Sequence, residues 1–284
     1  MRHPARPSVA IITDSTAALP PESIRQYGIR VIPLQLRIGD RTTDESKVGL
    51  DEVLDALHRE VPVRTAEPPS PEFFWAYHDA IAAGYREVVS LHISGRLSAT
   101  AASARDAAER CPFPVHVVDT LTAGMSLGFL AMAAADAAWR GATGAEVVYR
   151  VKEQQRRMSQ MIYVDTLEYL RRGGRIGKAA ALLGTAFSIK PLLGLADGEI
   201  VPLARVSGTN RALARLVDEA ANRSSGAPVN VGVEYFGAPE RAQLVADRLR
   251  RKLPKLRNVV ITRSSAVLAA HVGPGGIGLA VSPC

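Results

Sequence analysis

Short apolar runs rich in β-branched residues alternate with helical patterns along the first half of this chain. Strands are predicted at residues 9–13, 30–36, 87–92 and 115–118. Helices are predicted at residues 21–27, 50–59, 71–83 and 98–110. Parallel strands need a crossover connection, usually a helix, so this alternation is typical of an α/β fold with a largely parallel sheet. The class of fold is therefore constrained before any single motif is considered.

The second half contains further strands and helices and is long enough for a domain of its own. The expected helices lie at residues 123–139, 145–157, 167–171, 176–183, 210–221 and 239–253. The expected strands lie at residues 161–164, 199–206, 229–235 and 277–281 and near Val259. Gly173 and Gly174 should end the helix at 167–171. We place a domain boundary near residue 160, which gives two α/β domains, 1–160 and 161–284, in a chain of 284 residues.

The chain is basic, with a formal net charge of +7 and a pI near 9.7. Cations gather in two runs, one between Arg171 and Lys178 and the other between Arg248 and Arg257. A basic regulator that binds nucleic acid is one alternative, but aromatic residues make up only 5% of the chain. The basic runs lack the interleaved aromatics of a stacking surface, and the sequence has no helix-turn-helix pattern. Nucleic acid is therefore not an expected partner.

Cysteine content and hydropathy point to the cytoplasm. Cys111 and Cys284 have no metal-ligand spacing, so neither a disulfide framework nor a structural metal site is expected. The apolar run at 9–12 is cut short by Asp14, and the apolar stretch at 127–139 is too short to span a bilayer. We expect a cytoplasmic protein without stable membrane insertion.

Polar residues follow the first predicted strand, where open α/β sheets place their ligands. These are Thr13, Asp14, Ser15 and Thr16. Ser15 is a candidate ligand-binding residue, with capping of the following turn by Asp14 or Ser15 as the alternative. The glycine fingerprint of a dinucleotide site is absent here.

A second group of hydroxyl side chains follows the strand at 87–92. Ser94, Ser98 and Thr100 lie within seven residues, close to the start of the helix at 98–110. Free backbone N–H groups at a helix N-terminus favour an anion, and hydroxyl groups add further donors. Helix capping explains one of these hydroxyls, and three indicate an anion site.

A stiff, proline-containing loop at residues 64–71 precedes the helix at 71–83. Ser70 before Pro71 predicts an N-cap, because a serine oxygen can accept an orphan N–H and proline suits the first helical position. The prolines could equally serve only to stiffen the loop, without a role in binding.

Six motifs in order resemble the DegV family. They are Thr13-Asp14-Ser15, the loop 65–71, the segment 93–100 followed by Ser103-Ala104, the segment 165–176, Ile189-Lys190-Pro191 and the segment 271–278. Together they run from residue 13 to residue 278, so the resemblance covers nearly the whole chain.

The resemblance implies a two-domain α/β protein that binds one long-chain fatty acid, such as palmitate or oleate, in a tunnel between the domains. Family members use a Thr in the proline-containing loop and a Ser at the start of the helix after the third strand to hold the carboxylate. These residues match Thr65 and Ser98. The resemblance also implies a carrier that is not itself an enzyme and needs no cofactor, whose partner kinase subunit holds ATP and phosphorylates the acyl carboxylate.

The other candidate residues lie in the same motifs, except Arg205. Ser94, Ser15 and His271 are expected near the carboxylate, His271 because it precedes a Gly-Pro-Gly turn as in the family. Arg175 and Arg205 are candidates for contact with an acyl phosphate or with the kinase. For the basic segment at 171–175, the plain alternative is a solvated helix end. The apolar stretches at 179–189 and 192–195 are candidates for the tunnel wall or for ordinary core.

The chain departs from the family pattern at two places. Ala99 and Ala101 stand where many members have Gly and Tyr, and Ala66 and Glu67 replace Ser and Gln. Head-group geometry or acyl preference is expected to differ accordingly. The sequence leaves open the chain length, the degree of unsaturation, the oligomeric state and the existence of a kinase in the organism.

One further alternative is a small-molecule kinase subunit or a phosphatase. It would use Asp14, Ser94 and His271 as its catalytic group. Such an enzyme needs a nucleotide or metal site, and the sequence has neither a P-loop nor an acidic metal cluster.

Overall fold

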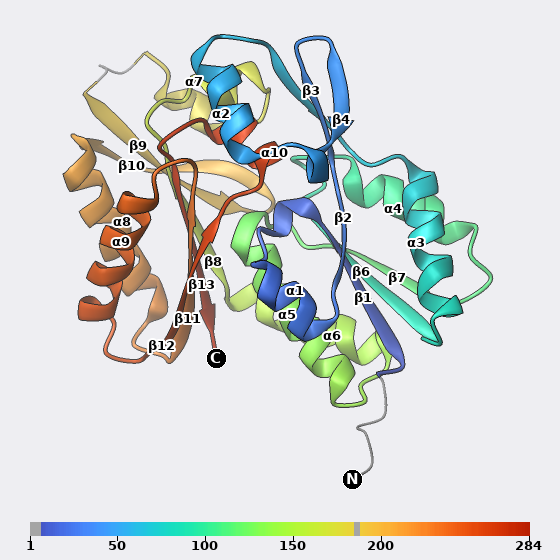
Figure 1. Ribbon diagram of the computed structural model, residues 1–284. Coiled ribbons are helices and arrows are strands. Elements are labelled where there is room, and N and C mark those ends of the chain that lie inside the picture. The colour runs from blue at the N-terminus through green and yellow to red at the C-terminus, as the bar shows by residue number, and fades with distance from the viewer. Residues whose placement is uncertain (1–6, 185–187) are drawn as a thin grey trace.

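The structure is a computed structural model that describes residues 7–184 and 188–284. In these residues the strands form a four-stranded, a six-stranded and a three-stranded sheet. Helices cover the outer faces of the two larger sheets, and further helices lie between them (Figure 1). The α/β prediction is confirmed.

The four-stranded sheet is entirely parallel. Its order is β2 (Arg30–Ile32), β1 (Val9–Asp14), β6 (Glu87–His92) and β7 (Val115–Asp119). Its connecting elements are η1 (Ser15–Ala17), α1 (Pro21–Tyr27), α3 (Ser70–Ala82) and α4 (Thr100–Glu109). Along β1, Val9 and Ile11 face one core while Ala10 and Ile12 face another with α3 and α4. The two central strands, β1 and β6, are buried on both faces, which explains why they read as largely apolar runs.

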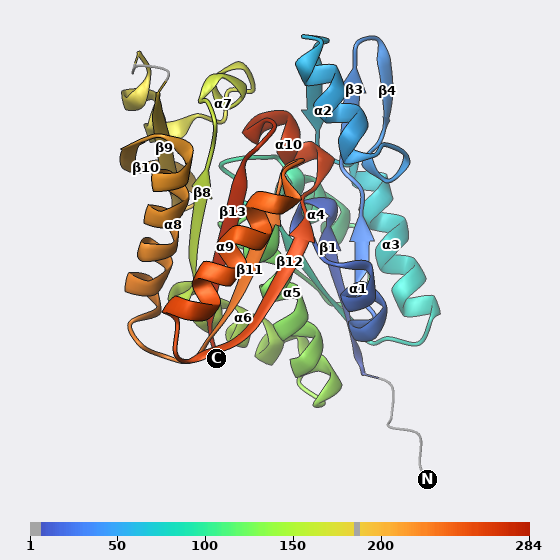
Figure 2. The same cartoon turned by 60° about the vertical axis from the view of Figure 1, so that its left-hand side comes forward.

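The six-stranded sheet is mixed. Its order is β10 (Glu199–Ser207), β9 (Ile189–Ala196), β8 (Ser159–Tyr163), β13 (Ile277–Pro283), β11 (Val229–Tyr235) and β12 (Leu256–Arg263). The outer face is covered by α8 (Thr209–Ser224) and α9 (Pro239–Lys252), as Figure 2 shows. Met161 of β8 packs toward these helices, and Ile162 faces the opposite way, toward the first half of the chain.

Helix α5 (Gly124–Trp139) lies between the two large sheets. Its first two turns are buried and apolar on nearly every side, while Asp136 and Trp139 near its C-terminus are exposed. Leu127 and Leu130 pack in the core against the parallel sheet, while Met125 and Phe129 pack with Ala280 of β13. Helix α6 (Gly144–Arg157) follows α5 and begins with a Thr143–Glu146 capping box. The buried helix α5 therefore fixes one large sheet against the other.

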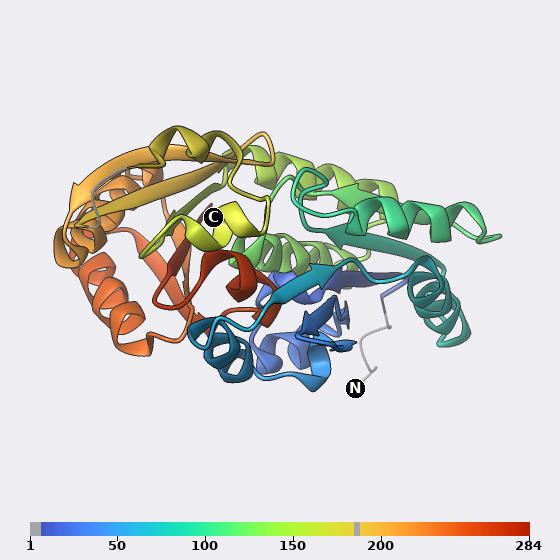
Figure 3. The same cartoon turned by 90° about the horizontal axis from the view of Figure 1, so that it is seen from above.

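The third sheet is small and antiparallel. It consists of β4 (Arg41–Asp44), β3 (Gln35–Ile38) and β5 (Val63–Ala66), with η2 (Glu45–Lys47) and α2 (Leu50–His58) between β4 and β5. From the far half of the chain come α7 (Glu168–Arg172), η3 (Gly177–Leu182) and α10 (Ala266–Val272). Helix α10 contacts α2, β5 and α7, and it lies at the centre of the molecule in the view from above (Figure 3, red). Segments about 200 residues apart in sequence thus meet at one place.

Several details of the predicted secondary structure are wrong. The helix expected at 176–183 is the 3-10 helix η3, and α10, β4 and β5 were not predicted. The strand expected at 30–36 is two strands, because Pro33 interrupts it, and β2 and β3 join different sheets. Ser70 is the first residue of α3 rather than its N-cap, and its hydroxyl bonds Asp106 and Arg110. Residues 189–196 form strand β9, which was not predicted as a strand. Helix α7 does end before Gly173, as expected.

Within residues 7–184 and 188–284, every helix lacks the length or the apolar character needed to cross a membrane.

Candidate functional site

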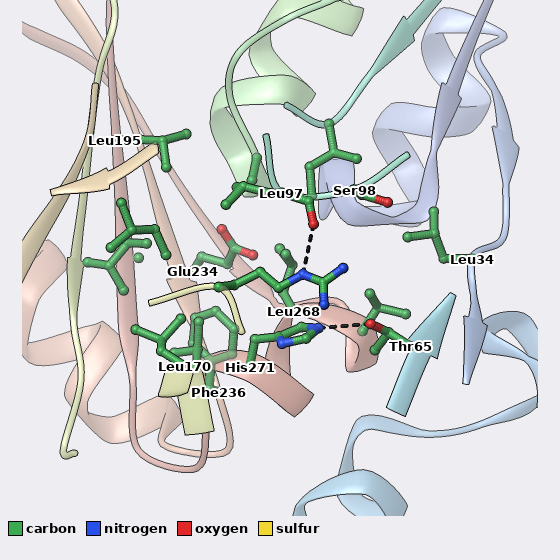
Figure 4. Close-up of a pocket in the computed structure, with 18 of the residues that line it drawn as sticks. Leu34, Thr65, Leu97, Ser98, Leu170, Leu195, Glu234, Phe236, Leu268 and His271 are labelled. Carbon is green, nitrogen blue, oxygen red and sulfur yellow. Dashed lines mark hydrogen bonds between the residues drawn. The ribbon is translucent and has the colours of Figure 1, made fainter. Parts of the chain in front are cut away.

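A mostly apolar cavity lies where the three sheets and α10 meet. We call it the main cavity; the space free of atoms inside it, its open mouth included, is about 780 Å³. Its apolar walls come from both halves of the chain: Leu34, Ile93, Leu97, Ile162, Leu170, Leu195, Ile200, Phe236, Val267, Leu268 and Val272. Its polar side chains are Thr65, Glu67, Ser98, Gln160, Arg175, Glu234 and His271. Thr65 and Ser98 lie toward one side and Leu170, Leu195 and Phe236 toward the other (Figure 4).

Thr65 and His271 form a hydrogen-bonded pair at the polar end of the main cavity. Thr65 lies on β5, where it is opposite Leu36 of β3, and its Oγ1 is 2.8 Å from Nε2 of His271 (Figure 4). His271 comes from the last turn of α10. The pair spans 206 residues of sequence, so only the folded chain brings these two groups together.

His271 is held uncharged by its surroundings. Burial, followed by the positive charge of Arg175, lowers the pKa of this imidazole to about 4. Its Nδ1 atom is buried without a hydrogen-bond partner among the described residues. It faces Gly173, where a β-carbon would lie 2.1 Å from Nδ1. Gly173 is therefore needed for the close approach of the imidazole, a role beyond the helix stop that the sequence predicts.

Ser98 lies just before α4. The helix begins at Thr100, two residues later than expected, and Ala99 is its N-cap without a side-chain cap. The Ser98 hydroxyl is 2.8 Å from the Thr100 hydroxyl and lines the main cavity. Ala66 and Glu67, the departures in the proline-containing loop, line it too. A hydroxyl group is thus positioned at a helix N-terminus, where the helix dipole favours an anion.

Arg175 bridges the two halves of the chain at the main cavity. Its Nε donates to the carbonyl oxygen of Leu97 at 3.0 Å, and its Nη1 donates to that of Gly173 at 2.8 Å. The guanidinium is half-buried and lines the cavity. Its charge is therefore close to the polar end without pairing with a carboxylate in these contacts.

Three other predicted site residues lie outside the lining of the main cavity. The Ser15 hydroxyl accepts from the Leu34 N–H at 2.9 Å, and the Ser94 hydroxyl donates to the Gly198 carbonyl oxygen at 2.8 Å. Arg205 is exposed on β10, where its Nη2 donates to the carbonyl oxygen of Ala181. Ser15 and Ser94 are each next to a lining segment, which they hold in place.

The apolar stretches at 179–189 and 192–195 were expected to form either the tunnel wall or ordinary core, and the structure places some of their residues in each. Leu195 lines the main cavity, whereas Leu192 and Leu193 pack in the cores. Ala179 and Leu182 also pack in a core. Residues 185–187 of the stretch 179–189 lie outside the described residues.

The catalytic group of the enzyme alternative is not assembled. Asp14 is fully buried and accepts from the Ile93 N–H at 3.0 Å; its Oδ2 is also 3.0 Å from Nδ1 of His92. His92 Nε2 is in turn 2.7 Å from the Ser90 hydroxyl. This Ser-His-Asp array has no exposed surface, so it ties β1 to β6 rather than meeting a substrate. Asp14 also caps η1 through the Thr16 N–H, as the plain alternative predicts.

Two polar residues of the main cavity were missed by sequence reasoning. Glu234 on β11 is fully enclosed; burial raises its pKa, although Ser264 and the Met125 N–H donate to it. Gln160 on β8 forms two hydrogen bonds with the backbone of Ala123. The sequence did contain an indication of Glu234. An acidic residue lies in the mostly apolar strand Val-Asn-Val-Gly-Val-Glu-Tyr, and a buried carboxylate is costly unless it has a specific role or partner. We find no comparable signal for Gln160.

The two basic runs are partly paired with neighbouring acids. Arg171 and Arg172 both bond Glu168, at 2.7 Å and 2.6 Å. In the second run, Arg250 bonds Asp247 and Lys252 bonds Asp218. These pairs reduce the local positive charge that a polyanion would need.

The comparisons with known proteins agree with this architecture. A model of the DegV family of uncharacterised proteins matches residues 8–283. A DegV domain-containing protein of Streptomyces coelicolor is 45% identical over 276 residues, which covers 96% of this chain and 98% of the relative. A structure of fatty acid binding by a DegV family protein from Thermus thermophilus has a TM-score of 0.92 at 29% identity, covering 97% of this chain and 99% of that one. The structure of DegV, a fatty acid binding protein from Bacillus subtilis, has a TM-score of 0.87 at 27% identity, covering 98% of this chain and 100% of that one.

Proposed function

Because the chain belongs to the DegV family, we propose that it binds one long-chain fatty acid in the main cavity, with the carboxylate at Thr65 and Ser98. The observation that carries the proposal is the shape and polarity of this cavity. Hydroxyl and imidazole groups gather at one side, and apolar side chains from both halves of the chain form most of the remaining wall. A single anionic head on a long apolar tail fits that division.

The Thr65–His271 pair can orient the hydroxyl proton. When Nε2 of the neutral imidazole carries the hydrogen, it donates to Thr65 Oγ1, and the Thr65 O–H is then free to donate to a carboxylate oxygen. Ser98 supplies a second hydroxyl at the N-terminus of α4. Hydrogen bonds to a charged group contribute about 1.5–3 kcal/mol each. Ser15 and Ser94 support the site by holding the segments of Leu34 and Ile93.

The tail supplies most of the binding free energy. Each buried methylene contributes about 0.8 kcal/mol, so a sixteen-carbon chain gains on the order of 12 kcal/mol before its ordering costs. The head group therefore needs to be hydrogen-bonded and kept reactive rather than clamped.

In the second part of the proposal, the protein is a carrier and a separate kinase subunit performs the chemistry. A carboxylate oxygen of the bound acid attacks the γ-phosphorus of ATP on the kinase, which forms acyl phosphate and releases ADP. Arg175 lines the main cavity together with Thr65 and Ser98, and Arg205 is exposed, so we assign them to the acyl phosphate and to kinase docking respectively. The carrier would work in the cytoplasm, where ATP is available. A domain boundary near residue 160, between α6 and β8, belongs to the same proposal.

Native mass spectrometry tests the first part directly. The purified protein should carry, or take up from oleate, an added mass equal to one fatty acid of 14 to 18 carbons. If the delipidated protein gains no such mass, the proposed fatty acid binding is wrong.

The second part has a separate test. Protein loaded with oleate is mixed with the ATP-binding subunit of a bacterial fatty acid kinase and ATP, and acyl phosphate is trapped as hydroxamate with hydroxylamine. We expect oleoyl hydroxamate only when both proteins and ATP are present. If the loaded protein yields no oleoyl hydroxamate, the kinase part of the proposal is wrong and only fatty acid binding is retained.

A further inference from the structure

The main cavity shares part of its wall with a second, more polar space. This space, which we call the side groove, is bordered by α6 and by the ends of β7 and β9, and contains about 1130 Å³ free of atoms, its opening included. Lys152, Gln155, Arg156 and Asp197 line it. Leu195 and Gln160 line both spaces. These two side chains therefore form the partition between an apolar cavity and a polar groove.

Gln160 is fixed in this partition by two hydrogen bonds. Its Nε2 donates to the Ala123 carbonyl oxygen at 2.8 Å, and its Oε1 accepts from the Ala123 N–H at 3.2 Å. Ala123 is the N-cap residue of α5 and lines the main cavity as well. A carboxamide has an acceptor oxygen next to a donor NH₂ group, so one Gln side chain can bond both the N–H and the C=O of a single residue. The amide is thus anchored to the buried helix between the two large sheets.

The direction of β8 places Gln160 in the wall of the cavity. Side chains alternate along a strand, so Gln160 and Ile162 point to the same face of the six-stranded sheet, and Ile162 also lines the main cavity. Leu195, the other member of the partition, lies on the opposite side of the cavity from Thr65 in Figure 4. The partition is therefore at the end of the main cavity that is far from the proposed carboxylate site.

From this geometry we propose that Gln160 and Leu195 set the longest acyl chain that the protein accepts, an inference that rests on the fatty acid binding proposed above. A chain that passes the partition must displace Gln160 from Ala123, which leaves a buried N–H and C=O without partners. Its last methylenes would then enter a groove lined by charged side chains and open to water, where burial no longer favours them. Shorter chains avoid both penalties.

Removing the amide tests the partition. Delipidated wild type and Gln160→Ala are loaded from an equimolar mixture of cis-monounsaturated acids of 14 to 22 carbons, and the bound acids are extracted and quantified. We expect the bound ratio of the 20- and 22-carbon acids to the 16-carbon acid to rise at least about fivefold in Gln160→Ala, the lower range for discrimination between chains that differ by methylenes. Gln155→Ala is the matched control, since Gln155 lines the side groove but not the partition, and its profile should equal that of the wild type.

Leu195→Ala removes the other side chain of the partition and leaves the Gln160–Ala123 hydrogen bonds in place. This variant tests the chain-length limit if Gln160→Ala does not fold. It should shift the profile in the same direction. A folded Gln160→Ala or Leu195→Ala protein that binds one fatty acid with the wild-type length profile overturns the inference and leaves fatty acid binding intact. A wild-type protein that binds none of the acids removes the proposed function itself.

Discussion

The imidazole of His271 should make the protein less stable as the solution is acidified. Its pKa is lowered to about 4 in the folded protein by burial and by Arg175, whereas an unfolded chain has a histidine pKa of about 6.5. Between these values the unfolded chain binds a proton that the folded protein does not. The free energy of unfolding therefore falls as the pH falls: this contribution is complete above about pH 6.5 and is lost as the pH approaches about 4.

The two pKa values set the size of the effect. One pKa unit corresponds to about 1.4 kcal/mol, so the complete loss, reached below pH 4, is about 3 kcal/mol. At pH 5 the linkage relation gives a loss of about 2 kcal/mol relative to pH 7.5. A loss of this size is a large fraction of the stability of an ordinary domain, about 5–15 kcal/mol.

Urea unfolding of wild type and His271→Gln at pH 5, 6 and 7.5 measures this contribution. The glutamine amide can still donate to Thr65 Oγ1, but it does not titrate. Groups common to both proteins, Glu234 among them, cancel in the difference between their free energies of unfolding. That difference should change by about 2 kcal/mol from pH 7.5 to pH 5, in favour of the glutamine variant at the lower pH. A difference that is the same at every pH would refute the claim that His271 is neutral because it is buried.

Three other substitutions test Thr65, Glu234 and the close approach of Gly173 to His271. Thr65→Val should weaken oleate binding about 10- to 150-fold in a competition titration, the equivalent of one hydrogen bond to a charged group, while Thr65→Ser should bind as the wild type does; equal affinity of the valine variant would remove Thr65 from the carboxylate site. Gly173→Ala places a β-carbon 2.1 Å from His271 Nδ1, so it should lower the free energy of unfolding by about 1–3 kcal/mol. Gly49→Ala, which meets no atom within 4 Å, is the control, and equal thermal stability of the two variants would contradict the close approach. Glu234→Gln should stabilise the protein at pH 8, because the raised pKa of the buried carboxyl makes ionisation costly in the folded state, and the gain should vanish toward pH 4.5, the ordinary pKa of the group; a gain that does not depend on pH, measured by urea unfolding, would contradict it.

The parallel sheet could be read from the sequence because its signal is local. Strands β1 and β6 are buried on both faces, so each reads as a largely apolar run, and the ends of β1, β6 and the half-buried edge strand β7 fall within one residue of the prediction. Pro33 was the local signal that should have divided the strand expected at 30–36.

The small sheet was missed although it presents Thr65 to the cavity. Its strands are short and carry several charged residues, so no apolar alternation marks them. Gly39 and Asp40 between β3 and β4 were a hairpin signal, since a glycine with positive φ suits a two-residue turn, and Gly39 has φ of 57°.

The polar end of the cavity illustrates what local patterns cannot give. The partner of Thr65 is 206 residues away, and Arg175 reaches across 78 residues to the Leu97 carbonyl. No periodicity encodes such pairings, because they depend on how α10 and the loop after α7 pack against the first half of the chain. Resemblance to a family pointed to Thr65, Ser98 and His271, and the fold brings all three to the lining of one cavity.

The charge of Arg175 serves both polar groups at this end of the cavity. It disfavours a proton on His271, and the same positive charge would offset part of the cost of taking a carboxylate out of water. The guanidinium donates to the carbonyl oxygens of Leu97 and Gly173, so it would act on the carboxylate as a nearby charge rather than as a two-pronged clamp. A carboxylate has about four lone-pair sites, and the hydroxyls of Thr65 and Ser98 would take two of them in the proposed complex. Phosphoryl transfer requires one of the remaining lone pairs, so such an arrangement would be compatible with the proposed presentation of the acid to a kinase.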